Sequence, residues 1–345
     1  MVELIQDSLR FRFPEVYPGA ELTLDCQRTL RIPDDGRSYA LPPGLGRFPV
    51  RHVDDFAARL PESWRRRGGV MLPMYQAEAL WLCFRSAEVA SRETSYPFAV
   101  KIAAGKINAV NGESWRDGLD FDPQGYVVVP RQPWLDGFVV GEGTIRQFVA
   151  MPLGAGYSAE EQLAGEAEWG GMQVEVFPMK REVFERRFPV RRRRSLVSED
   201  LLCMSPPPAA ADFHIDMALA PGGKMQQQIE IDPYEPADWD LACGQRCFVH
   251  LANSMVWRAI TGAEPPHAPL TAEEYTRAGL PWFDWYSEQP AVPGSEKLAG
   301  LSSVHELGQH KGELPLPENQ SVEPKKVVAL GPAKRRRSLV RVGSW

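Results

Sequence analysis

Short apolar runs separated by glycine and proline make up most of this chain. Near its start, SLRFRF, ELTLDC and RTLRIP alternate apolar with polar positions, and PDDG and PPGLG supply turn residues. Such alternation predicts half-buried strands joined by turns. We therefore expect residues 1–50 to form a β-rich N-terminal section, packed as an extension against the rest of the protein.

The strand pattern returns after Tyr96. The segments YPFAVKIAAGKINAV, YVVVP, FVVGEGTIRQFVAMP and GMQVEVFPM are followed further along by DFHIDMAL and KMQQQIEID. Runs of β-branched and aromatic residues with glycine and proline between them are typical of an antiparallel sheet. Within them, GEGTIR at residues 141–146 predicts a tight hairpin turn, because glycine is the usual residue of such turns.

Helical spacing of apolar residues appears in two longer segments and one short one. The short segment HVDDFAARL predicts a short helix. The longer segment QRCFVHLANSMVWRAITG predicts a helix that ends at Gly262. In PMYQAEALWLCF the apolar face would consist of Met74, Ala77, Leu80, Trp81 and Phe84, and in QRCFVHLANSMVWRAITG of Phe248, Leu251, Ala252, Met255 and Ile260.

Two further helices are predicted by capping boxes. In SAEEQLAGEAEWGG, Ser158 stands three residues before Glu161, and Gly170-Gly171 is the expected stop. In TAEEYTRAGLP, residues 271 and 274 repeat the arrangement before a glycine and a proline.

These elements predict an α+β fold with a mixed, mainly antiparallel β-sheet core and several short helices. We expect the β-rich section over residues 1–50, one α+β core module over 51–311, and a proline-rich linker with a basic tail over 312–345. The length of 345 residues and the 43% hydrophobic content suit a buried core of this size.

Apolar runs, the N-terminal sequence and the cysteines indicate the cellular environment of the protein. No run approaches the roughly 18 apolar residues of a membrane span, and the acidic start does not resemble a signal peptide. Five scattered cysteines do not suggest a disulfide framework. We expect a soluble, cytoplasmic protein without a membrane partner.

Several distinctive short motifs lie within the predicted core module. The segments QPWLDG, GTIRQFVAMPLGAGY and YTRAGLPWF, together with GGKMQQQIEIDPY, resemble a family of uncharacterised proteins of bacteria and fungi. The resemblance covers most of residues 51–304. It implies a single continuous module over that span and assigns no catalytic residue.

Charge is unevenly distributed along the chain. Residues 180–194 hold eight basic and two acidic residues, and residues 325–341 hold seven basic and no acidic ones. Since the net charge of the whole chain is −6, the remainder carries −19. The remainder of the chain is thus acidic, and the two basic segments can bind to it at least as readily as to an external polyanion.

The two basic segments share the sequence RRRSLV. One contains Arg191, Arg192, Arg193 and Arg194 before Ser195, and the other contains Lys334, Arg335, Arg336 and Arg337 before Ser338. We favour a structural role, in which the arginines prevent edge-to-edge pairing of strands and form ion pairs with the acidic remainder of the chain. The serines also fit a basophilic kinase, and nucleic-acid binding is the less favoured alternative because the rest of the chain is acidic.

A metal site is the main catalytic alternative. His214 and Asp216 share one face of a predicted strand, a spacing found in 2-His-1-carboxylate iron sites, and His250 or another histidine would complete the set. Fe or another divalent metal would then be the cofactor. His250 and Cys247 also stand one helical turn apart, but an ordinary buried cysteine explains that pair better.

Aromatic residues in connections suggest a binding role. Trp134, Trp239, Trp282 and Trp285 stand in or beside proline- and glycine-rich segments, where they either contact a partner or pin loops to the core. Arg146 of GEGTIR is a further candidate for binding a ligand. The leading prediction is a non-catalytic module without cofactor that binds a protein partner or its own copies, and the alternative is a His/Asp/His metal enzyme.

Overall fold

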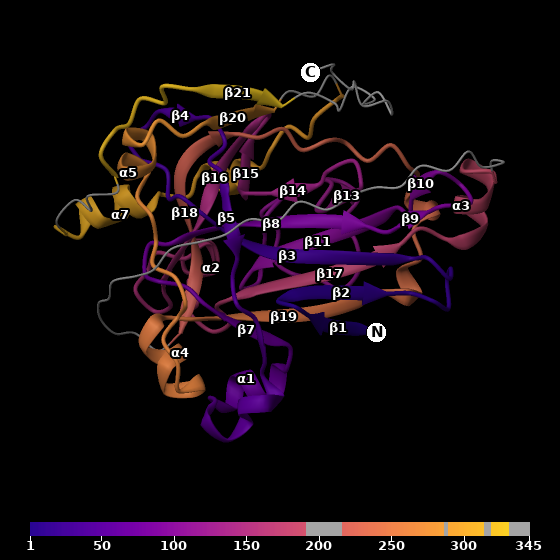
Figure 1. Ribbon diagram of the computed structural model, residues 1–345, viewed down its shortest axis with the longest axis horizontal. Helices are drawn as coiled ribbons and strands as arrows, with labels where there is room; N and C mark the ends of the chain where they lie inside the picture. The colour runs from indigo at the N-terminus through magenta and orange to yellow at the C-terminus, as the bar shows by residue number, and fades with distance from the viewer. Residues whose placement is uncertain (191–215, 286–288, 314–318, 331–345) are drawn as a thin grey trace, which may run out of the picture.

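The computed structural model describes residues 1–190, 216–285, 289–313 and 319–330. Within these ranges, strands dominate and nearly all of their pairings are antiparallel. Parallel pairings join β18 to β4, β19 to β7 and β20 to β21. The predicted α+β fold with a mixed, mainly antiparallel sheet is therefore confirmed (Figure 1).

One half of the sheet is built from strands of the N-terminal section and the middle of the chain. Its strands are β1 (Val2–Ile5), β2 (Ser8–Arg12), β3 (Glu21–Thr29), β8 (Ala79–Ser86), β16 (Thr144–Pro152) and β18 (Met217–Gln226), paired in that order. Shorter strands pair at its margins: β4 (Ser38–Tyr39), β5 (Gly44–Arg47), β14 (Trp134–Leu135) and β15 (Gly137–Gly141).

The other half centres on two strands that are buried on both faces. They are β11 (Phe98–Ala104) and β17 (Met172–Pro178). Around them pair β12 (Ile107–Asn108), β13 (Val127–Val129), β19 (Gln245–Ala252), β7 (Val70–Pro73) and β6 (Arg51–His52). Their apolar runs are what burial on both faces requires.

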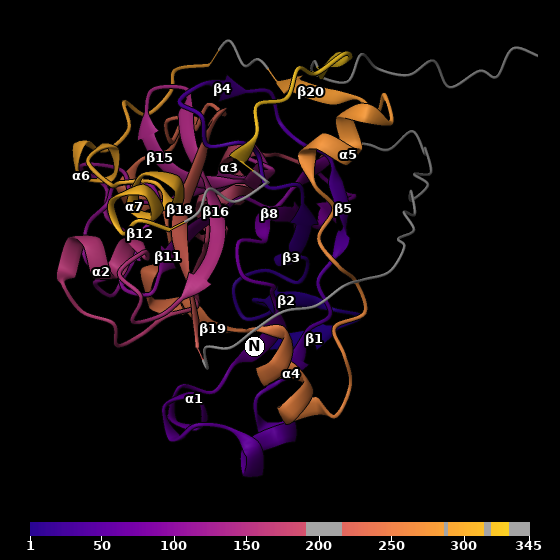
Figure 2. The ribbon, with the colours of Figure 1, turned by 90° about the vertical axis from the view of Figure 1, so that its left-hand side faces the viewer.

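The two halves face each other and share one core. Met217 of β18 pairs with Leu251 of β19, which joins them at one end. Across the interior, the ring of Phe13 lies 5.6 Å from that of Phe98, and buried residues of both halves form one cluster. Figure 2 shows β2, β3 and β8 separated from β11 and β12 by this interior.

Short helices cover the ends of the sheet. At the lower end of Figure 1, α1 (Glu62–Arg67), α4 (Ser254–Thr261) and the 3₁₀ turn η1 (Asp54–Arg59) pack around Trp64 and Trp257. At the upper end lie α5 (Ala272–Arg277), α7 (Val304–His310) and the two-stranded sheet of β20 (Trp282–Trp285) and β21 (Val327–Leu330).

The remaining elements are small. They are α2 (Ala159–Ala164), α3 (Arg181–Arg187), α6 (Glu296–Ala299), the 3₁₀ turns η2 (Pro236–Asp238) and η3 (Leu241–Cys243), and the strand pair β9 (Glu88–Val89) and β10 (Thr94–Ser95). None of the helices in the described ranges has the length and apolar character needed to cross a bilayer.

The helix predicted over PMYQAEALWLCF is wrong, because this segment contains strand β8. Leu80, Leu82 and Phe84 are buried, whereas the residues between them are half-buried. This period of two suits a strand, and β8 pairs with β3 from Ser86 opposite Leu22 to Ala79 opposite Thr29. Long-range pairing thus overrides a local spacing that also fitted a helix.

The long helix predicted over QRCFVHLANSMVWRAITG is wrong in its first half. Residues 245–252 form β19, and α4 begins only after Asn253, whose side-chain oxygen accepts hydrogen bonds from the N–H groups of residues 255 and 256. Cys247 and His250 therefore point to opposite faces of a strand, not to one helical face. Gly262 ends α4 in the left-handed conformation, as predicted.

Both predicted capping boxes are confirmed. Ser158 and Glu161 form one at α2, and Thr271 and Glu274 form the other at α5. The helix after Ser158 is shorter than predicted, since it ends at Gly165 instead of Gly170-Gly171. The hairpin turn at GEGTIR is also confirmed: β15 and β16 are antiparallel, with Gly141 opposite Thr144.

The N-terminal section is β-rich as predicted, with strands β1 to β5 inside residues 1–50. Its strand β3 pairs with β8, so the section shares a sheet with the predicted core module. The division at residues 50 and 311 stays a prediction.

Candidate functional site

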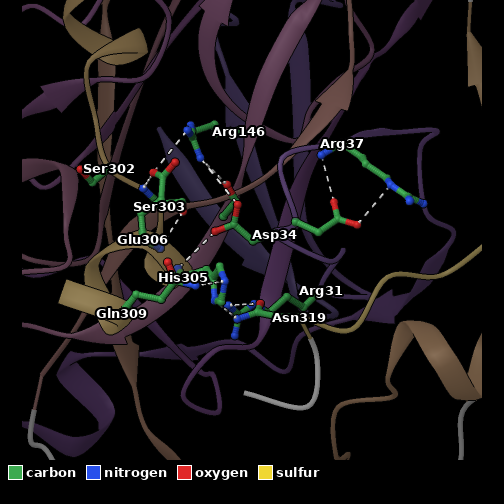
Figure 3. Close-up of polar contacts among 12 residues, drawn as sticks. Arg31, Asp34, Arg37, Arg146, Ser302, Ser303, His305, Glu306, Gln309 and Asn319 are labelled. Atoms are coloured by element: carbon green, nitrogen blue, oxygen red, sulfur yellow. Dashed lines mark hydrogen bonds and ion pairs between the residues drawn. The ribbon is translucent and has the colours of Figure 1, made fainter. Parts of the chain in front are cut away.

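Arg146, a predicted ligand-binding residue, lies inside the protein. Its side chain is 8% exposed, and its guanidinium nitrogens lie 3.8 Å from Asp34 Oδ1 and 3.5 Å from Glu306 Oε2 (Figure 3). It also donates to the carbonyl oxygen of Gly222 at 3.4 Å. The guanidinium is thus paired with two carboxylates inside the protein, and its role in binding a ligand stays a prediction.

The network around Arg146 joins distant segments of the chain. Asp34 Oδ2 accepts the backbone N–H of His305 at 3.2 Å, at the start of α7. The His305 ring lies 2.9 Å from the amide of Asn319, whose oxygen accepts from Arg31 at 3.0 Å (Figure 3). These contacts fix α7 and the segment around Asn319 to the sheet, which is a structural role.

Two of the candidate tryptophans are core residues. Trp239 is 1% exposed and Trp282 is 0% exposed, and each indole N–H donates to a side-chain oxygen. Their rings therefore pack loops against the core, which is one of the two roles that the sequence left open for them. Their role in binding a partner stays a prediction. Trp134 is half-buried, and the side chain of Trp285 lies outside the described part of the structure.

The proposed metal ligands can be placed only in part. His250 Nε2 lies 3.0 Å from the carbonyl oxygen of Gly68, and its ring stacks on Trp64 at 4.5 Å. Burial lowers the pKa of His250 to about 4 and raises that of Asp216. Among the described residues no group of three His, Cys, Asp or Glu side chains is arranged to hold a metal. His214 lies outside them, so this alternative stays a prediction.

The arginine clusters at 191–194 and 334–337, with Ser195 and Ser338, lie outside the described residues. Their predicted structural role therefore stays a prediction. An acidic loop, DPYEPADWD, follows β18 at residues 232–240. The carboxylate of Asp232 in this loop accepts hydrogen bonds from the side chains of Tyr126 and Trp239. Asp238, in the same loop, pairs with Arg187 at 2.7 Å. This loop is thus engaged within the fold.

A groove of about 470 Å³ is the candidate functional site. Three segments that are far apart in the sequence form its walls: the connection between β12 and β13, the residues after β18, and the start of α6. The α6 helix lies at the left of Figure 2. The lining consists of Val110, Asn111, Glu113, Phe121, Asp122, Pro123, Gln124, Ile231, Val292, Pro293, Gly294, Ser295, Glu296 and Lys297.

Buried amide side chains hold the first wall in place. Asn108 is fully buried, donates to the carbonyl oxygen of Gly125 at 2.8 Å, and accepts from the N–H of Val110 at 2.8 Å. Asn111 donates to the carbonyl oxygen of Pro123 at 3.2 Å. The connection is thereby fixed, because an asparagine side chain can substitute for missing backbone partners.

The other two walls are hydrogen-bonded to the first and to each other. Gln124 accepts from the N–H of Asp232 at 2.8 Å and donates to the carbonyl oxygen of Glu230 at 3.2 Å. The N–H of Ile231 donates to the carbonyl oxygen of Pro290 at 3.0 Å. The groove therefore exists before any ligand binds.

Gly294 closes the third wall against the sheet. Its φ is +81°, and a Cβ at this position would lie 2.4 Å from backbone atoms of Gly141. Only glycine permits both the left-handed conformation and this close approach. The next residue, Ser295, donates its N–H to the carbonyl oxygen of Val139 at 3.1 Å.

The groove combines an apolar lining with a negative rim. Phe121, Ile231 and Pro293 present apolar surface, and Ile231 is 46% exposed. Glu113 pairs with Lys297 at 2.7 Å, while residues 122 and 296 are exposed acidic residues. Three carboxylates against one ammonium group leave a net negative charge.

A second cavity is too small to be a binding site. It measures about 10 Å³ and lies beside the buried ion pair of Arg28 and Glu78, whose side chains are 3.3 Å apart. That volume holds about one water molecule.

Sequence reasoning selected none of the groove residues. They lie in three connections that come together only in the fold, and each connection looks like an ordinary turn by itself. The asparagines of INAVNG were an available signal of an ordered connection, since asparagine side chains often hydrogen-bond nearby backbone groups in turns.

Comparison with protein-family models, with curated proteins and with solved structures found no match.

Proposed function

We propose that the protein is a non-catalytic binding module whose groove takes a peptide segment of a protein partner. The peptide would carry apolar side chains next to one or more basic side chains. The observation that carries this proposal is the preformed groove of about 470 Å³, which falls within the usual range of ligand sites, about 300–1,000 Å³.

The apolar lining supports a peptide with apolar side chains. Ile231 is 46% exposed at the groove although it belongs to a residue type that is usually buried. A ligand side chain that covers Ile231 and Phe121 would remove apolar surface from water, worth about 25 cal/mol per Å². This burial would supply most of the affinity.

The rim supports a basic residue beside the apolar ones. Asp122 and Glu296 are exposed carboxylates, so a lysine or arginine of the ligand would meet opposite charge. Such exposed pairs contribute little to affinity, up to about 1 kcal/mol each, but they select the orientation and speed association.

The hydrogen-bonded walls support binding without rearrangement. Asn108, Gln124 and Gly294 hold the three segments before a ligand arrives. A site that is already ordered loses less conformational entropy on binding, which favours a useful affinity from a short segment.

Selection from a displayed random-peptide library tests the proposal. The full chain should enrich peptides in which apolar residues are followed or preceded by lysine or arginine. Ile231→Asp should abolish the enrichment, because it places a charge on the apolar wall. Leu241→Asp is the matched control, since Leu241 is 45% exposed but does not line the groove.

The proposal predicts that the Leu241→Asp variant selects the same peptides as the natural chain. An enriched set without apolar and basic residues would contradict it. So would a set that binds equally well to the Ile231→Asp variant, because the binding surface would then lie elsewhere.

A further inference from the structure

We propose that the groove is occupied in the free protein by the chain's own basic segment Lys334–Val342, which an external peptide must displace. This inference rests on the proposed function, because it takes the groove as the peptide site. It adds a regulatory step, in which the protein blocks its own site.

The segment has the composition that the groove favours. KRRRSLVRV contains five basic and no acidic residues, and its apolar residues are Leu339, Val340 and Val342. Apolar side chains beside basic ones are what an apolar wall with a negative rim selects. The three apolar residues would cover Ile231 and its neighbours, and the arginines would face Asp122 and Glu296.

The chain offers a matched comparison in Arg192–Asp200. This segment, RRRSLVSED, shares RRRSLV with the other but ends in Glu199 and Asp200. With three basic and two acidic residues it carries a net charge of +1, against +5 for Lys334–Val342. Its carboxylates would meet the carboxylates of the rim, so it should bind less well.

The position of the segment permits binding within one molecule. The described chain stops at Leu330, the last residue of β21, only four residues before Lys334. In Figure 2, β20, which pairs with β21, and α6 both lie in the upper half of the molecule, on opposite sides of it. Leu339 is the ninth residue beyond Leu330, and nine extended residues span about 30 Å. This length exceeds the radius of gyration of about 20 Å expected for a chain of 345 residues.

Internal occupation would lower the apparent affinity for external peptides. The apparent dissociation constant rises in proportion to the inverse of the unoccupied fraction. A groove that is filled nine-tenths of the time would bind an external peptide about tenfold more weakly. Removing the charge of the segment should therefore increase external binding.

The test measures fluorescence anisotropy of a labelled Lys334–Val342 peptide with full-length proteins at physiological salt. The variant R335Q/R336Q/R337Q should bind the peptide at least tenfold more tightly than the natural chain. Adding Ile231→Asp to that variant should weaken binding at least tenfold, whereas adding Leu241→Asp should leave it unchanged. A labelled Arg192–Asp200 peptide should bind at least tenfold more weakly than Lys334–Val342.

Equal affinity of the natural chain and R335Q/R336Q/R337Q would overturn the inference, as would binding that is insensitive to Ile231→Asp. The proposed function is judged separately by the library-selected peptides. If those peptides depend on Ile231 but Lys334–Val342 does not bind, only internal occupation fails. If neither binds at the groove, both proposals fail.

Discussion

Asp136 is a buried carboxylate whose pKa depends on its burial and on one hydrogen bond. It is 4% exposed and accepts a hydrogen bond from the side-chain amide of Gln227 at 2.8 Å. Burial raises the pKa of Asp136 to about 7. Burial also raises the pKa of Glu78 to about 7, although Arg28 opposes the shift.

The raised pKa values predict that stability falls as pH rises. In the unfolded chain a carboxyl group has a pKa of about 4, so the folded state binds the proton more tightly. The stabilisation is complete below about pH 4 and is lost as pH rises towards 7. Thermal unfolding of the natural chain should therefore occur at lower temperature at pH 8 than at pH 5.

The variant Asp136→Asn isolates the contribution of this residue to the pH dependence of stability. The amide keeps an acceptor for Gln227 and cannot ionise, so the variant should be more stable than the natural chain at pH 8, by about 1 to 4 kcal/mol, with little gain at pH 4. Urea unfolding at the two pH values checks it. Asp117→Asn, at an 89% exposed position, is the control and should change neither value by more than about 0.5 kcal/mol. An equal effect of Asp136→Asn at both pH values would contradict this explanation.

The two helix starts marked by capping boxes were predictable from sequence, whereas the choice between helix and strand was not. The capping boxes at Ser158 and Thr271 rely on contacts three residues apart, which the sequence displays directly. Strands β8 and β19 have apolar residues at spacings that fit either structure. Their pairing with β3 and β17 decides the outcome, and the partners are distant in the chain.

The start of α7 gives a test of a buried cap. Ser303 is 0% exposed, and its hydroxyl oxygen accepts from the N–H of Glu306 at 3.1 Å. Ser303→Ala should lower the free energy of unfolding by about 2 kcal/mol, because water cannot replace the lost acceptor.

Thr271→Ala removes the same kind of cap from α5 at a less buried position. It should cost about 1 kcal/mol or less, since solvent can satisfy the freed N–H. Urea unfolding of both variants makes the comparison. Equal losses, or a larger loss for Thr271→Ala, would show that burial of the cap does not set its contribution.

At the scale of the whole molecule, sequence predicted the fold class but not the site. Alternating runs and turn residues indicated a mainly antiparallel sheet with short helices, because these signals are local. The groove brings together residues near positions 110–124, 231 and 292–297, and its shape depends on the bonds of Asn108 and Gln124. Three of the residues that the sequence did indicate, Arg146, Trp239 and Trp282, are buried.

The charge distribution of the sequence can be related to the acidic rim of the groove in the folded molecule. The sequence indicated an acidic body with basic segments, and the groove places apolar surface inside a rim of carboxylates. Under our proposals this groove takes a basic, apolar segment, either from a partner or from the chain itself. The proposed function and the proposed self-inhibition would then depend on one surface.

The isoleucine methyl NMR spectrum of the full chain tests most directly whether this groove is the binding site. On titration with a library-selected peptide, the signal of Ile231 should shift, because its methyl group lines the groove. The signal of Ile5, which is 36% exposed on β1 and does not line the groove, should stay in place. A saturating peptide that leaves Ile231 unchanged while other signals move would contradict the account.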